Sequence, residues 1–124
     1  MSKKNKSICI IRSNPVCPDS RVEKEAWTLK KSGYDVHILA WDRSSDIYEV
    51  NTFIDVIDEK IPITRLGHKA TFGEGFKNIK AYLSFQFHMR KWLRKQKFDI
   101  IHACDFDTAF SSISIAKKKK IKFI

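Results

Sequence analysis

The sequence predicts an α/β domain built on a doubly wound parallel sheet, as in Rossmann-like folds. Three short runs, at 8–11, 36–40 and 100–101, are almost entirely apolar, as strands are when helices cover both faces of a sheet. Segments with helical periodicity separate these runs, and such alternation indicates right-handed crossovers between parallel strands. With 124 residues the chain should form one domain, spanning 1–124.

Apolar spacing and flanking residues define each expected element. Ser20 and Glu23 match a capping box, and Gly33 stands where the helix that follows should end. Pro62 cannot donate to a sheet ladder, which predicts either an edge strand or a strand start at this residue. Asp107 or Thr108 should cap the last helix. The expected strands are 7–12, 35–41, 48–57, 61–66, 99–103 and 121–124, and the expected helices are 20–32, 76–97 and 107–117.

Composition excludes several classes of protein. Hydrophobic residues make up 43% of the chain, with four glycines and three prolines, which excludes disordered and collagen-like chains. No run approaches about 18 apolar residues, so we expect no spanning helix, and the first apolar run is too short for a secretory leader. Three widely spaced cysteines form no disulfide framework and are expected as free thiols. A cytoplasmic protein is therefore expected.

Positive charge is concentrated in the second part of the chain. Residues 77–122 carry 12 basic and 3 acidic side chains, and the whole chain has a formal net charge of +10. At helical spacing, the apolar and basic residues of 76–97 are expected on opposite sides of a helix. The expected apolar side is Phe76, Ile79, Tyr82, Leu83, Phe87, Met89 and Leu93, and the expected basic side is Lys77, Lys80, His88, Lys91 and Lys95.

Two interpretations of this helix are open. Its apolar side can pack in the core, with the basic side simply solvated. Alternatively, Lys77, Lys80, Lys91 and Lys95 face an anionic membrane, where each basic side chain contributes about 1 kcal/mol. Nucleic acid is not expected as a partner, because no recognition motif or stacking platform accompanies the charge.

Two loops are expected to meet at the carboxyl edge of the sheet. Ligands of doubly wound sheets bind where strand order reverses, and a reversal beside the first strand brings its loop to the loop after 99–103. The candidate cleft residues are Asn14, Asp19, Arg21, His102 and Asp105. Arg21, at a helix start, is suited to an anion, and Asp105 to an acceptor hydroxyl. His102 is interpreted mainly as a packed histidine, and no metal site is expected, because two neighbouring carboxylates alone are a weak signal.

Two segments carry a family resemblance. The first is SNPVCPDSRVEKEA at 13–26, followed by LKKSGYDV at 29–36, and the second is FDIIHA at 98–103, leading to Asp105. Both resemble segments of glycosyltransferase family 4 enzymes. The resemblance implies the N-terminal, acceptor-side half of a GT-B fold. Such enzymes transfer a sugar from a nucleotide-sugar donor with retention, usually without a bound metal.

The resemblance also sets the functional expectations. The family's donor-binding half, with its paired glutamates, has no counterpart in these 124 residues. We therefore expect a fragment, truncated frame or split enzyme that is inactive alone and binds no cofactor itself. Its expected partners are a nucleotide sugar, a sugar or lipid-linked acceptor, and a separate donor-domain chain, at the inner face of the membrane. The alternative is a non-catalytic basic module that binds an anionic membrane or a partner protein.

Overall fold

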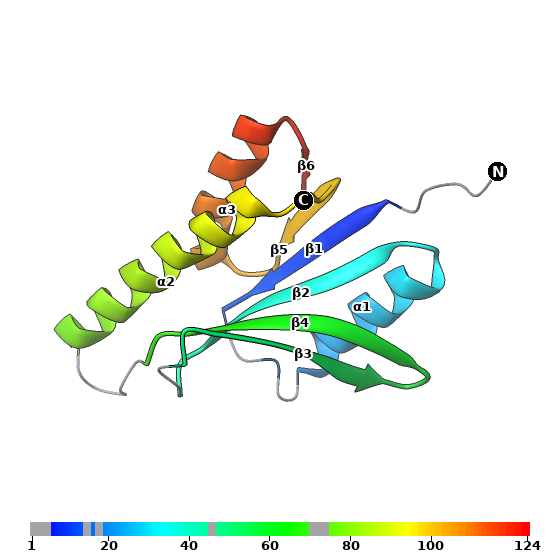
Figure 1. Cartoon of the computed structure of the whole chain (residues 1–124), viewed down its shortest axis with the longest axis horizontal. Coiled ribbons are helices and arrows are strands. Elements are labelled where there is room, and N and C mark those ends of the chain that lie inside the picture. The colour runs from blue at the N-terminus through cyan, green and yellow to red at the C-terminus, as the bar shows by residue number, and fades with distance from the viewer. Residues whose placement is uncertain (1–5, 14–15, 17–18, 45–46, 70–74) are drawn as a thin grey trace.

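In the computed structural model, a six-stranded sheet lies between helices that cover both of its faces (Figure 1). The structure describes residues 6–13, 16, 19–44, 47–69 and 75–124, without the side chains at 75–78, 106–107 and 110. The strands are β1 (Ser7–Arg12), β2 (Asp35–Asp42), β3 (Glu49–Val56), β4 (Glu59–Gly67), β5 (Ile100–Ala103) and β6 (Lys122–Phe123). The helices are α1 (Ser20–Lys31), α2 (Gly75–Lys95) and α3 (Phe106–Lys119).

The strand order β3-β4-β2-β1-β5-β6 confirms the predicted doubly wound sheet. β1 pairs in parallel with β2 on one side and with β5 on the other, so that Ile8 lies opposite both Val36 and Ile100. The strand order therefore reverses between β1 and β5, as expected. Only β3 runs antiparallel to its neighbour, at one edge of the sheet.

Alternating side chains divide the interior into two cores. Ile8 and Ile10 point to the face covered by α1 and pack with its Ala26. Cys9 and Ile11 point to the opposite face, beneath α2 and α3. Figure 1 shows α1 on one side of the sheet and the other two helices on the other. Burial on both faces explains why the first strand is an unbroken apolar run.

The N-caps of two helices are residues other than those expected. The N-cap of α1 is Asp19, whose carboxylate accepts from the Val22 amide at 3.4 Å, while Glu23 accepts from the Asp19 amide at 3.1 Å. The capping box therefore starts one residue before Ser20. The N-cap of α3 is Asp105 rather than Asp107 or Thr108.

The predictions made from Gly33 and Pro62 can be compared with the structure. α1 ends as predicted, because Gly33 adopts a φ of +97° that side chains disfavour. Of the two positions predicted for Pro62, the edge strand is wrong, since β4 lies between β3 and β2, whereas Pro62 does lie in the first half of β4. Its pairing with β2 starts only at Ile63, so at Pro62 itself β4 has a neighbour on one side alone.

The buried side of α2 differs from the predicted apolar side. Ala81, Phe85, His88, Met89 and Trp92 face the core, whereas Ile79, Leu83 and Phe87 are 55%, 59% and 74% exposed. His88, predicted on the basic side, is buried, while Lys80, Lys91 and Lys95 are exposed as predicted and the side chain of Lys77 lies outside the described residues.

Stacking on the sheet explains this orientation of α2. The Phe85 ring lies parallel to the Trp41 ring of β2, with centroids 4.7 Å apart and an interplanar angle of 8°. Apolar residues occupy most of the circumference of α2, so its own sequence left the choice of buried side open. No helix among the described residues is both long enough and apolar enough to cross a bilayer.

Alanine substitution at two neighbouring phenylalanines tests this orientation. Phe85→Ala should lower the free energy of unfolding by about 3–5 kcal/mol, because it leaves a cavity beneath Trp41. Phe87→Ala is the matched control and should change it little, since that ring is mostly in solvent. Urea denaturation of both variants gives the comparison, and similar losses in the two would contradict the orientation.

Candidate functional site

Arg12, at the end of β1, joins the two loops at the point where strand order reverses. Its Nε donates to Asp19 Oδ2 at 2.8 Å, and its Nη1 donates to Asp105 Oδ1 at 2.5 Å. The second oxygen of Asp105 accepts from the Ser13 amide at 2.7 Å. We call Arg12, Asp19 and Asp105 the Arg12 clamp. It links the N-terminal end of α1 to the N-terminal end of α3 through Arg12.

The three charged groups of the Arg12 clamp are largely withdrawn from solvent. Their side chains are 19%, 11% and 21% exposed for Arg12, Asp19 and Asp105. Burial alone would lower the pKa of Arg12, but the hydrogen bond to Asp19 and the charges of Asp105 and Asp19 outweigh it and leave that pKa raised. Charge-assisted hydrogen bonds of this kind are among the stronger ones in proteins, so the clamp fixes the geometry of this edge.

The loop before α1 also contains an unusual backbone conformation. Val16 is buried and has a φ of +51°, a left-handed value that β-branched residues rarely adopt. Its carbonyl accepts a 3.4 Å hydrogen bond from Arg65 Nη2 on β4. Asn14, predicted to line the cleft, and Cys17, predicted to be a free thiol, lie outside the described residues.

A cavity of about 540 Å³ runs along α1 beside this edge. Arg21 and Lys24, from the first turns of α1, share its wall with His102 of β5 and with Ile124 after β6. Arg21 is exposed and follows Asp19 of the clamp by two residues. The structure therefore brings four predicted cleft residues, namely Asp19, Arg21, His102 and Asp105, to neighbouring positions on α1, β5 and the loop after it.

Glu25, His102 and Cys104 form a further cluster at this cavity. One potential metal-ligand atom from each lies within 4.8 Å of the others, and His102 Nδ1 is 3.7 Å from Glu25 Oε1. Burial, with the charge of Glu25 adding to it, raises the pKa of the Cys104 thiol to about 11. The thiol is therefore protonated at neutral pH. Histidine, cysteine and carboxylate are the ligand types of zinc, so these residues are where this face would hold such an ion.

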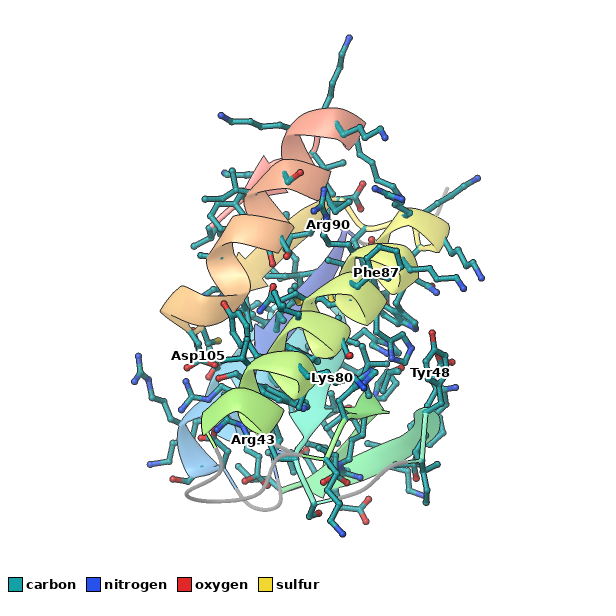
Figure 2. All side chains as sticks on the ribbon, turned by 90° about the vertical axis from the view of Figure 1, so that its left-hand side faces the viewer. Arg43, Tyr48, Lys80, Phe87, Arg90 and Asp105 are labelled. Carbon is teal, nitrogen blue, oxygen red and sulfur yellow. The ribbon has the colours of Figure 1, made fainter. Side chains whose placement is uncertain are left out.

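A second polar cluster, of Tyr48, His68 and His88, was not predicted. The Tyr48 ring stacks on His88 at 3.7 Å, and His68 Nε2 lies 2.8 Å from His88 Nδ1. In Figure 2, Tyr48 and Asp105 are on opposite sides of α2. Burial, and to a lesser extent the neighbouring charge of His68, lowers the pKa of His88 to about 4. No sequence spacing links these residues, since the sheet and α2 alone bring them together.

Comparison with known proteins decides the family. The model of Glycosyltransferase Family 4 matches residues 21–124. The chain belongs to glycosyltransferase family 4. This confirms the family resemblance seen at 13–36 and 98–105, and the match contains most of both segments.

Solved structures share the fold of this family 4 chain at low identity. Two crystal structures of the C-terminal domain of a hydrogenase from Pyrococcus furiosus cover 100% of the chain, with TM-scores of 0.66 and 0.64. They are 12% and 11% identical to it, and the alignments cover 95% and 93% of those domains. At such identity the likeness shows the fold alone. No curated protein matches the chain.

Removal of the guanidinium should destabilise the family 4 chain. Arg12→Met leaves two half-buried carboxylates without their cation, and we expect the free energy of unfolding to fall by about 2–3 kcal/mol. The control is Lys31→Met, which removes an exposed ion pair with Asp58 and should shift the urea midpoint only slightly. Equal shifts would mean that the Arg12 clamp is no stronger than a surface pair.

Acid should destabilise the fold through His88. The folded pKa is about 4 against about 6.5 in the unfolded chain, so the unfolded state binds the extra proton as pH falls below 6.5. The free energy of unfolding therefore falls as the pH is lowered from 6.5 to 4. The total loss is roughly 3 kcal/mol once His88 is protonated in the folded state as well. Denaturation of wild type and His88→Phe across this range gives the test. Parallel pH profiles of the two proteins would contradict the assignment.

Proposed function

We propose that this chain is the acceptor-side part of a retaining glycosyltransferase that moves a sugar from a nucleotide-sugar donor to an acceptor. Membership of family 4 supports the glycosyltransferase class. The observation that carries the placement of the site is the Arg12 clamp, which holds the loops after β1 and β5 together where strand order reverses. That position is where doubly wound sheets bind their ligands.

Arg21 is the residue that we assign to an anionic group of the donor or acceptor. Its guanidinium is exposed, and Lys24 lies one turn further along α1 on the wall of the same 540 Å³ cavity. Free amides at the start of a helix add favourable interactions with an anion. The anion is a phosphate of the nucleotide sugar or a charged group on the acceptor.

Asp105 is assigned to the acceptor hydroxyl, with His102 and Asp19 beside it. Both Asp105 oxygens already accept hydrogen bonds, from Arg12 and from the Ser13 amide. Each carboxylate oxygen has a second lone pair that can accept from a hydroxyl. In the transfer itself, a bond forms between the acceptor oxygen and the sugar, the bond from the sugar to the nucleoside diphosphate breaks, and the departing diphosphate takes up the proton of the acceptor hydroxyl.

The donor-binding half is proposed to come from a separate domain or chain. By the family resemblance, that half contributes the paired glutamates and contacts most of the nucleotide sugar. Residues 1–124 would then form a single acceptor-side unit that is inactive alone. Its acceptor would be a sugar or a lipid-linked sugar.

Reconstitution tests this function. We expect no release of nucleoside diphosphate from a panel of uridine and guanosine nucleotide sugars with the chain alone, and release when a family 4 donor-binding domain is fused after Ile124. Arg21→Met in the fusion should raise KM about tenfold or more, as the loss of about 1.4 kcal/mol of binding predicts. Lys60→Met, an exposed lysine of β4, is the control.

Several results would overturn parts of the proposal. Turnover by the isolated chain would show that it is active alone, and a product of inverted anomeric configuration would exclude retention. If Arg21→Met and Lys60→Met behaved alike, the anion would bind elsewhere. If no donor or acceptor supported transfer by a folded fusion, the glycosyltransferase function itself would be rejected.

A further inference from the structure

The solvent side of α2 combines apolar and basic side chains. At 100° per residue, its members fall within about 120° of arc around the helix. They are Ile79, Lys80, Leu83, Phe87, Arg90, Lys91 and Arg94, and we call them the outer face of α2. The opposite side of the helix already packs in the core through Phe85 and Met89, so core packing does not account for the outer face.

The apolar part of the outer face is continuous rather than scattered. Ile79, Leu83 and Phe87 lie on three successive turns and are each more than half exposed. Leu83 and Phe87 also line a groove of about 380 Å³ whose far wall is Tyr48, itself 55% exposed. Single exposed apolar residues are ordinary on a protein surface, but a contiguous patch indicates an interaction site.

The charged part of the outer face is entirely positive. The sequence of α2, Gly75–Lys95, contains no aspartate or glutamate. Phe87, Arg90, Lys91 and Arg94 line a second hollow of about 420 Å³. In Arg90, Nη2 donates a weak 3.4 Å bond to Ser114, and the buried Nε has no partner among the described residues. Three cations and one aromatic ring therefore line the same hollow, beside an apolar surface.

We propose that the outer face of α2 docks on an anionic lipid bilayer. Leu83 and Phe87 enter the boundary between headgroups and acyl chains, and Arg90, Lys91 and Arg94 contact lipid phosphates. Interfacial helices have this composition, with aromatic and aliphatic anchors among basic residues. The proposal does not depend on glycosyl transfer, because it uses a surface on the other face of the sheet from the α1 cavity.

Charge complementarity favours a bilayer over other occupants. A second copy of the chain would bring another helix without acidic residues against this one, and with a net charge of +10 per chain the two copies would repel. Nucleic acid would satisfy the cations but would gain little from Ile79 and Leu83. An anionic membrane satisfies the basic and the apolar side chains together.

Vesicle co-sedimentation with the whole chain tests the proposal. We expect binding to vesicles of 30% phosphatidylglycerol in phosphatidylcholine, little binding to pure phosphatidylcholine, and weakening as sodium chloride is raised from 0.1 to 0.5 M. The double change Lys91→Gln and Arg94→Gln should lower the partition coefficient about 25-fold, from about fivefold for each basic side chain. Phe87→Ala should lower it about tenfold.

Matched variants distinguish binding through the outer face of α2 from non-specific adsorption to vesicles. Phe53→Ala removes another mostly exposed ring, from β3, and Lys60→Gln removes an exposed charge from β4; neither should change binding by more than about twofold. In Phe87→Trp, brominated acyl chains should quench the new indole, which places residue 87 below the headgroups. Circular dichroism melting shows that the variants are folded.

Other results would overturn the proposal. Equal binding to neutral and anionic vesicles would show that the basic side chains do not drive binding. Equal effects of Phe87→Ala and Phe53→Ala would show that the outer face of α2 is not the contact surface. Displacement by inorganic phosphate at millimolar concentration would indicate a free anion site. Displacement by duplex DNA at matched phosphate, with no quenching in Phe87→Trp, would indicate nucleic acid instead.

Discussion

A single guanidinium between two carboxylates links the two loops at the carboxyl edge of the sheet. Asp19 is the N-cap of α1 and Asp105 is the N-cap of α3, and both bind Arg12. Helices on opposite faces of the sheet therefore start from the same charged group, although their N-caps are 86 positions apart in the sequence. Because the three side chains are largely buried, the attraction between them is weakly screened by salt. The Arg12 clamp therefore ties the N-cap of α1 to the N-cap of α3 at this edge of the sheet.

Sequence reasoning succeeded where one local signal decides the outcome. The unbroken apolar runs located β1, β2 and β5, and their alternation with helices gave the strand order around β1. It failed where tertiary contacts decide. Arg12 at the end of a strand carries no signal of its two partners, and nothing in the spacing of His68 and His88 brings them to Tyr48. For α2, apolar residues surround most of the helix, so the ring of Trp41 on the sheet selected the buried side.

The fold and the family make separate contributions to the functional conclusion. A hydrogenase domain shares this arrangement of strands and helices at 12% identity, so the architecture by itself does not determine the chemistry. The family match supports the glycosyltransferase class, and the proposed site for sugar transfer lies beside α1, next to the Arg12 clamp. The outer face of α2 lies on the other side of the sheet, and it is the surface that we propose docks on an anionic bilayer. An enzyme arranged in this way would approach a lipid-linked acceptor with its polar cleft and its membrane contact on different helices.

The division of the interior into two cores has an evolutionary consequence. Ile10 and Ala26 belong to one core, Ile11 and Phe85 to the other, and the backbone of the sheet separates them. A change of side-chain volume in one layer is therefore relieved within that layer. Side chains beneath α2 and α3 can therefore vary in sequence without a direct steric effect on those beneath α1, beside the α1 cavity.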